Sequence, residues 1–176
     1  MKKFTMTIAV ILLSFFGTLS LVACARVPDN YKDARLNLRE NDYDVLVGTE
    51  SDESIDVASG VLFELIYSLE DEEEMEVGET YANFLGEDEL ELEKDIEYAI
   101  AGLSENGEGK DFLLIIYFED SKALATHYDD FVNVFEFLIN NTFDSEVCLI
   151  ENDDLEYGKS KNILYFGTAQ ALKDSK

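Results

Sequence analysis

Residues 112–118 read Phe-Leu-Leu-Ile-Ile-Tyr-Phe, and this unbroken apolar run decides the fold class. Seven apolar residues in a row, rich in aromatic and β-branched types, are typical of a central strand in a sheet. The residues in front of it, 105–109, contain Asn-Gly and a second glycine. Both tolerate positive φ, so they predict a turn from a preceding strand over 95–103.

The segment behind the run predicts the clearest helix of the chain. Asp120 and Ser121 can cap its first turn, because a side-chain oxygen can accept a hydrogen bond from a free backbone N–H there. Apolar residues then recur at helical spacing and form a stripe that would face a core. These residues are Leu124, Tyr128, Phe131, Val132, Phe135, Leu138 and Ile139.

The same periodicities predict the remaining elements. They are a helix after the Asp29-Asn30 cap that ends near Asn41-Asp42, a strand over 43–47, a helix over 54–70, strands over 146–151 and 162–167 with polar turns at 152–154 and 158–161, and a short helix from Ala169. From residue 43 the order is βαββαβ, which is ferredoxin-like. It predicts an α+β fold with an antiparallel sheet and helices on one face, plus the N-terminal helix and the C-terminal hairpin strand and short helix. A different α+β sandwich built from the same elements is the alternative.

The composition fits one acidic domain. The chain has 176 residues with 13 Lys and Arg against 39 Asp and Glu, a formal net charge of −26, and 47% hydrophobic residues. This is enough for a packed core in a single domain over 29–176. The strongly negative charge excludes a partner bound through a nucleic-acid backbone.

The N-terminus predicts export. Lys2 and Lys3 precede the apolar stretch 8–16, as in a secretory signal peptide. A membrane-spanning anchor is the alternative, because the uncharged stretch 4–25 is about long enough to span a bilayer. The residues that follow, Leu21-Val22-Ala23-Cys24, resemble the lipobox of bacterial lipoproteins.

The lipobox resemblance implies a lipid anchor. A signal peptidase would cut between Ala23 and Cys24 and remove residues 1–23, and the Cys24 thiol would carry a diacylglyceryl group. Residues 24–28 would then be the lipidated N-terminus and a short tether, so the domain is expected close to the membrane. Two acyl chains hold a soluble domain on a bilayer far more firmly than one. The expected location is the outer face of the cytoplasmic membrane, or the outer membrane if the source is Gram-negative.

A second resemblance covers scattered motifs of the mature chain. Residues 34–41, 43–45, 116–123 and 165–168 are similar to small uncharacterised lipoproteins and exported proteins of clostridial-type Gram-positive bacteria. Those sequences often have Gly after the first helix, where this chain has Asp42. The left-handed conformation at that helix end is therefore expected at Asn41 or Asp42. The resemblance implies no catalytic activity.

Catalytic and cofactor motifs do not occur in the sequence. His127 is the single His and lies between Leu124 and Phe131 on the predicted long helix, so a buried or boundary position is expected. Lipidation of Cys24 would leave Cys148 alone, inside the apolar run 147–150, as a buried thiol without a disulfide. One His and one free Cys cannot make a zinc site. We therefore expect neither an enzyme nor a bound cofactor.

Carboxylates are the one abundant functional group. Residues 50–97 contain 19 acids and one base. The candidate ligands for Ca²⁺, which prefers oxygen donors, are Glu70, Asp71, Glu72, Glu73 and Glu74, although their spacing matches no EF-hand loop. A solvated face or a mobile loop is the simpler interpretation of such a charge run.

The predicted function is therefore interaction at the cell envelope. Aromatic residues near acidic or turn segments could present a surface to an envelope protein or peptide: Tyr67, Tyr81, Phe84 and Tyr157. Phe112, Phe118, Phe131 and Phe135 are assigned to the core. The alternatives are a Ca²⁺-binding surface protein and a small envelope hydrolase with paired carboxylates.

Overall fold

The computed structural model describes residues 27–87, 89–106, 109–144, 146, 148, 150 and 154–176. Its centre is an antiparallel five-stranded sheet in the order β1-β2-β3-β5-β4. The strands are β1 (Asp44–Gly48), β2 (Ile96–Asn106), β3 (Gly109–Phe118), β4 (Leu155–Ser160) and β5 (Ile163–Thr168). The apolar run 112–118 is indeed central, because β3 pairs with β2 on one side and with β5 on the other.

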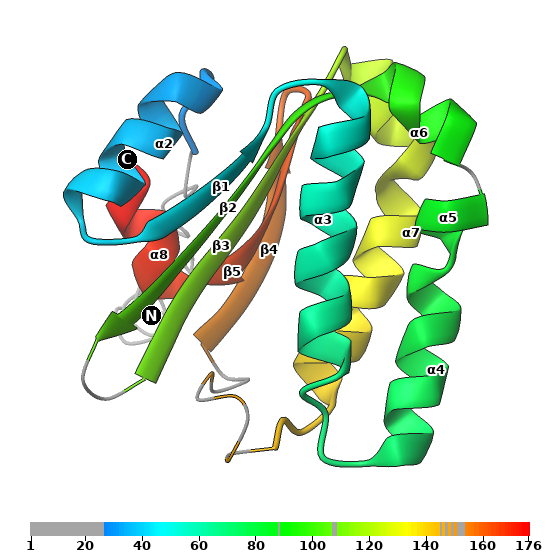
Figure 1. Cartoon of the computed structure of the whole chain (residues 1–176). Helices are drawn as coiled ribbons and strands as arrows, with labels where there is room; N and C mark the ends of the chain where they lie inside the picture. The colour runs from blue at the N-terminus through cyan, green and yellow to red at the C-terminus, as the bar shows by residue number, and fades with distance from the viewer. Residues whose placement is uncertain are drawn as a thin grey trace, which may run out of the picture.

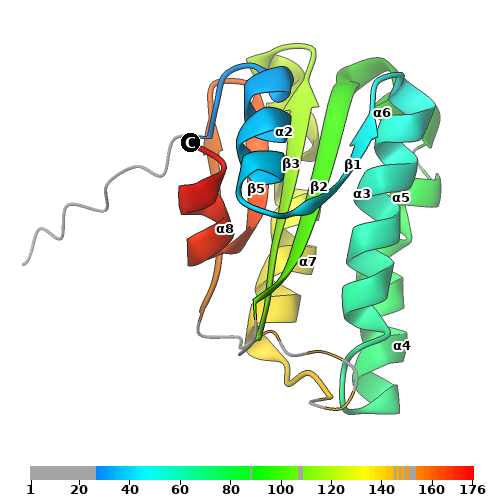
Figure 2. The same ribbon diagram turned by 60° about the vertical axis from the view of Figure 1, so that its left-hand side comes forward.

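Helices cover both faces of this sheet (Figure 1). One face carries α3 (Ser51–Ile66) and α7 (Ser121–Asn140), with α4 (Glu72–Ala82), α5 (Phe84–Glu87) and α6 (Glu89–Asp95) outside them. The other face carries α2 (Tyr31–Glu40) and α8 (Ala169–Asp174), which lie side by side in Figure 2. We call these the α3/α7 layer and the α2/α8 layer.

The α+β class and the antiparallel sheet are confirmed, but the strand order is not ferredoxin-like. In that order the first strand would lie inside the sheet, whereas β1 lies at its edge and pairs antiparallel with β2, the next strand in sequence. The connection explains the difference. The chain runs along α3 and then returns through α4, α5 and α6 before it enters β2 (Figure 1), so β2 can lie directly beside β1.

The acidic segment after α3 is helical with its acids on the outer side, which agrees with the solvated-face interpretation and contradicts the mobile loop. Asp71 caps α4 by accepting a hydrogen bond from the backbone N–H of Glu73 at 2.8 Å. Acids in the first turn of a helix also interact favourably with its dipole. The side of α4 that packs against the protein carries the small residues Gly78 and Ala82, and both are buried. The acids therefore cover the outer surface of a packed helix.

The C-terminal hairpin is displaced from its predicted place. The predicted strand 146–151 is not a strand at the described positions 146, 148 and 150, and its other residues lie outside the described part. Cys148 and Ile150 instead bury their side chains in the core. The predicted turn 158–161 falls mostly in β4, and the chain reverses at Lys161, which has φ 59°. An edge strand tolerates this polar composition because only one of its sides is paired.

Smaller details of the N-terminal half agree with the sequence. The Asn30 side chain caps α2 by accepting from the backbone N–H of Lys32 at 2.9 Å. Asp42 has φ 63°, so the left-handed residue is one of the two expected after this helix. The helix expected over 54–70 begins earlier, at Ser51, and ends at Ile66. No helix in the described ranges is both long and apolar enough to cross a membrane.

Candidate functional site

The predicted lipid-attachment residue Cys24 and the cleavage residue Ala23 lie outside the described residues. The first described residue, Val27, stands three positions after Cys24 and is only 1% exposed. It belongs to the buried cluster beneath the α2/α8 layer, together with Leu38 and Tyr43. Residues of the expected tether are therefore already part of the folded domain.

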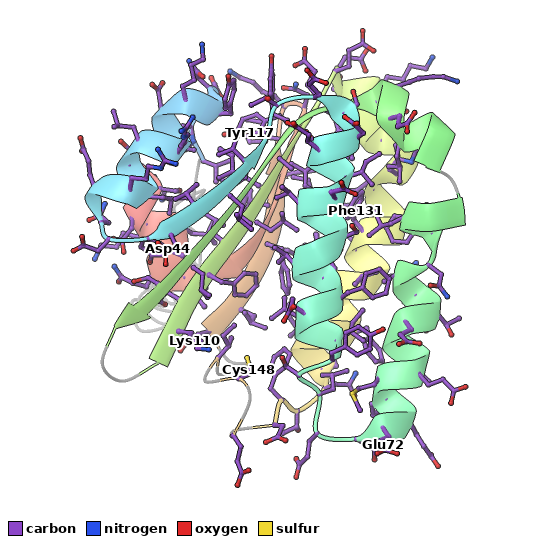
Figure 3. All side chains as sticks on the ribbon, in the orientation of Figure 1. Asp44, Glu72, Lys110, Tyr117, Phe131 and Cys148 are labelled. Atoms are coloured by element: carbon purple, nitrogen blue, oxygen red, sulfur yellow. The ribbon has the colours of Figure 1, made fainter. Side chains whose placement is uncertain are left out.

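Two polar contacts hold this first segment against the sheet. The Tyr117 hydroxyl, on β3, donates a hydrogen bond to the Pro28 carbonyl at 3.1 Å. Burial raises the pKa of Tyr117, and the nearby Asp29 and Asp33 raise it further. Asp29 forms an ion pair with Lys161 in the β4–β5 turn. Figure 3 shows Tyr117 at the α2 side of the sheet. The segment that follows the proposed anchor is thus fixed by β3, by the β4–β5 turn and by apolar contacts.

The candidate Ca²⁺ ligands do not converge. The backbone N–H of Glu70 donates to the Thr142 carbonyl at 3.0 Å, and the Asp71 side chain is the cap of α4. Glu72, Glu73 and Glu74 form the first turn of α4, and Figure 3 shows Glu72 at the end of the helix. Among the described residues no group of three or more His, Cys, Asp or Glu side chains could hold a metal ion.

His127 is buried in a structural pair. It is 4% exposed, its Nε2 lies 2.8 Å from Oδ2 of Asp95, and its ring stacks on Phe118 with centroids 6.2 Å apart. Asp95 is the last residue of α6, so the pair ties α7 to the start of β2. Among the described residues, this contact gives the Nε2 atom of His127 its polar partner.

Cys148 is buried, as expected, and is free of any disulfide within the described residues. Burial raises the pKa of its thiol, and the smaller opposing effects of a backbone hydrogen bond from Ile150 and of the Lys110 charge lower it. Both residues lie at one end of the sheet (Figure 3). A protonated buried thiol is a poor nucleophile.

The four aromatic residues that sequence placed at the surface behave differently from one another. Tyr67 and Tyr81 are exposed, at 57% and 46%. Phe84 instead packs edge-on against Phe131, with centroids 5.1 Å apart. The Tyr157 hydroxyl donates to Oε1 of Glu136 at 2.7 Å, and this hydrogen bond, together with burial and the Glu136 charge, raises the pKa of Tyr157 to about 12. The residues assigned to the core, Phe112, Phe118, Phe131 and Phe135, are all buried.

A second exposed apolar surface was missed. Leu46 in β1 and Leu103 in β2 are 65% and 43% exposed. Leu46 pairs with Ala101 and Asp44 pairs with Leu103, so the two leucines are diagonal neighbours on one face of the sheet. We call them the edge patch. Alternation in the strand 43–47 could have indicated it, because Val45 and Val47 take the buried face and leave Leu46 on the other.

The edge patch is open because α3 diverges from the strands. Gly48 lies against the backbone of Ser54, which an added Cβ would overlap, so the first turn of α3 meets the end of β1 directly. From there α3 and the sheet separate toward the start of β1 (Figure 1). In the described chain β1 pairs with β2 alone, and its other side is a free strand edge.

Comparison with known proteins does not identify the chain. No protein-family model, curated protein or solved structure matches it.

Proposed function

We propose that the protein is a lipoprotein held on the outer face of the cytoplasmic membrane through Cys24, and that its domain is a non-catalytic interaction module of the cell envelope. The observation that carries the proposal is the burial of Val27, three positions after Cys24. A chain whose core begins this close to the lipobox cysteine has no stalk between anchor and domain. The lipobox itself supplies the chemistry of the anchor.

The edge patch is the surface we assign to the partner. It combines two exposed leucines with the unpaired edge of β1. An extended peptide that adds to such an edge gains backbone hydrogen bonds, and alternate side chains of the peptide can contact the apolar patch. Asp44 lies within this strand, and residues 44–168 carry 34 acids against five bases. The expected partner is therefore an extended apolar segment with neutral or basic neighbours, from an envelope protein or peptide.

Radiolabelled palmitate tests the anchor. The full chain should incorporate label and fractionate with membranes, and Cys24→Ala should abolish both. The matched control is Cys148→Ala, which removes the other cysteine and should keep both. Labelling that persists in Cys24→Ala would contradict the proposal.

Site-specific photo-crosslinking tests the interaction surface. A photoreactive residue at Leu46 in the full chain on intact cells should give a discrete adduct. The control position is Val77 on α4, an apolar residue that is 46% exposed and lies in the α3/α7 layer. The same adducts from both positions, or none from Leu46, would show that the edge patch is not a binding surface.

A further inference from the structure

We propose that the α2/α8 layer is the membrane-facing surface of the protein, and that α2 rests on an anionic lipid surface through Leu36, with Lys32 and Arg39 beside it. The inference depends on the lipid anchor proposed above and adds an orientation to it. Three observations carry it: the outer face of α2 with its exposed Leu36, the division of charge between the two layers, and the reach of the tether.

The outer face of α2 presents one exposed apolar residue with two bases on one flank. Ala34 and Leu38 are buried against the sheet, whereas Leu36, on the opposite side, is 54% exposed. At about 100° per residue, Lys32 and Arg39 lie within about 60° of Leu36 on one flank. An exposed apolar residue beside basic residues is typical of interfacial helices, in which the bases contact headgroups.

Acids lie on the other flank of α2. Asp33 and Glu40 are exposed there. This flank points toward α8, because the Asn37 side chain donates to the Ser175 carbonyl at 3.1 Å. The end of the chain that includes α8 adds Lys173 and Lys176, both exposed. The acids of α2 therefore lie on the side of the helix that faces the C-terminal segment, which carries Lys173, Asp174 and Lys176.

Charge divides sharply between the two parts of the molecule. Residues 27–43 and 169–176, which form the α2/α8 layer, carry five bases and five acids. Residues 44–168 carry five bases and 34 acids. An anionic membrane attracts nearby Lys and Arg by about fivefold in binding per residue and repels acids. The Debye length of about 8 Å limits both effects to the nearest charges, so the layer that touches the lipid determines the orientation.

The tether leaves little freedom to choose another layer. Three residues span at most about 11 Å of extended chain, and Val27 is buried beside Leu38 of α2. Acyl chains on Cys24 would therefore bring the lipid surface to the α2/α8 layer, while the sheet separates the α3/α7 layer from it (Figure 2).

Fluorescence quenching from within the bilayer tests the orientation. The full lipidated chain with Cys148→Ser is placed in vesicles of phosphatidylglycerol and phosphatidylcholine that contain a nitroxide-labelled lipid. An environment-sensitive fluorophore is attached at Leu36→Cys or, as the matched control, at Tyr67→Cys, which is 57% exposed in the other layer. We expect a loss of fluorescence at position 36 and none at position 67. Equal loss at both positions, or a greater loss at 67, overturns the orientation.

Charge reversal separates electrostatic contact from simple proximity. Lys32→Glu with Arg39→Glu should reduce the fluorescence loss at position 36. Lys94→Glu with Lys122→Glu makes the same change in net charge at exposed positions outside the α2/α8 layer and should leave that loss unchanged. If the first pair has no effect, the bases of α2 do not contact the lipid and the proposal fails.

Palmitate labelling of the same samples distinguishes the two proposals. A chain that is lipidated and sediments with vesicles, but shows equal quenching at both positions, overturns the orientation and leaves the anchor standing. A chain that carries no lipid and does not sediment with vesicles overturns both.

Discussion

The two faces of the sheet are packed with different kinds of side chain. The α3/α7 face is a broad aromatic core in which Phe131 lies among Phe84, Phe118 and Phe135, with ring centroids 5.1–6.1 Å apart. The α2/α8 face is smaller and joins apolar contacts to hydroxyl groups: Tyr117 donates to Pro28, and Tyr43 donates to Asp174 at 3.2 Å. The α3/α7 face contains the larger buried cluster, and the α2/α8 face holds both ends of the described chain.

The two faces therefore differ in what they contribute: one to the free energy of folding, the other to the position of the segment next to the proposed anchor. Burial of large aromatic side chains dominates the free energy of folding, so the α3/α7 face should supply most of the stability. Residues 44–168, which include the helices of that face, carry 34 of the 39 acids. The α2/α8 face is nearly neutral in charge and holds the segment next to the proposed anchor. We infer that the sheet divides an outward acidic surface from a surface that can lie against lipid.

Phe131→Ala should have the largest effect on stability. Phe131 is fully buried, and truncation of such a side chain costs about 3–5 kcal/mol of unfolding free energy. Because β3 contributes residues to both clusters, hydrogen exchange should report the same loss in α7 and in α2. Loss of protection in α7 alone would show that the two faces unfold separately. Tyr67→Ala, at an exposed position, should change stability by less than about 0.5 kcal/mol.

A pair of glycine substitutions tests the junction that opens the edge patch. Gly48→Ala places a Cβ on the backbone of Ser54 and should cost about 1–3 kcal/mol in chemical denaturation. Gly60 lies in the same helix as Ser54, with open space around its Cβ position. Gly60→Ala should therefore stabilise the protein by about 0.5–1 kcal/mol. Equal effects at the two positions would contradict the close contact between β1 and α3.

The two helix caps should differ in their dependence on pH. Asp120 caps α7 by accepting from the N–H groups of Lys122 and Ala123 at 2.7 and 2.8 Å, and these bonds lower the pKa of the Asp120 carboxyl. The cap therefore stabilises the fold fully above the unfolded pKa of about 3.9 and loses its effect as pH falls through the lower folded value. Asn30 makes the equivalent cap on α2 without a titrating group.

Thermal unfolding across this pH range measures the contrast. Asp120→Ala should lower the Tm at neutral pH, and its difference from the parent protein should shrink as the pH falls below about 4. Asn30→Ala should cost about 0.5–2 kcal/mol at every pH. A constant deficit for Asp120→Ala would mean that the capping bond does not depend on the carboxylate charge.

Ca²⁺ should have the smallest effect. The candidate acids 70–74 do not converge in the described structure, so about 10 mM CaCl₂ should leave the Tm at its value in NaCl of equal ionic strength. A site with a Kd near 0.1 mM would instead raise the Tm by roughly 5–10 °C. Such a shift would show that the acidic residues bind Ca²⁺ and do not merely form a solvated surface.

Local patterns in the sequence predicted the elements with strong periodicity. Four features can be recognised from short stretches of sequence, and the structure contains all of them: the run 112–118, the stripe on α7 and the caps at Asn30 and Asp120. The helicity of α4 was missed because its buried face consists of Gly78 and Ala82, which add almost no hydrophobic signal. The burial of Gly78 depends on Ile66 and Phe137, whose side chains pack against it. Contacts between residues so far apart in the sequence cannot be inferred from local spacing.

The strand order and the edge patch depend on long-range geometry. The position of β1 beside β2 follows from the return path through α4, α5 and α6, and the exposure of Leu46 follows from the direction that α3 takes after Gly48. Periodicity in β1 specifies which residues share a face but not whether a helix covers that face. Sequence therefore predicts the candidate anchor, whereas the edge patch is found only in the structure.

Mass spectrometry of the mature protein tests the lipid anchor on Cys24. We expect that the purified membrane form begins at Cys24, without residues 1–23, and that its N-terminal peptide carries two acyl chains. A mature chain that begins at any other residue, or that begins at Cys24 without acyl chains, would contradict the lipid anchor and the membrane-facing role of the α2/α8 layer.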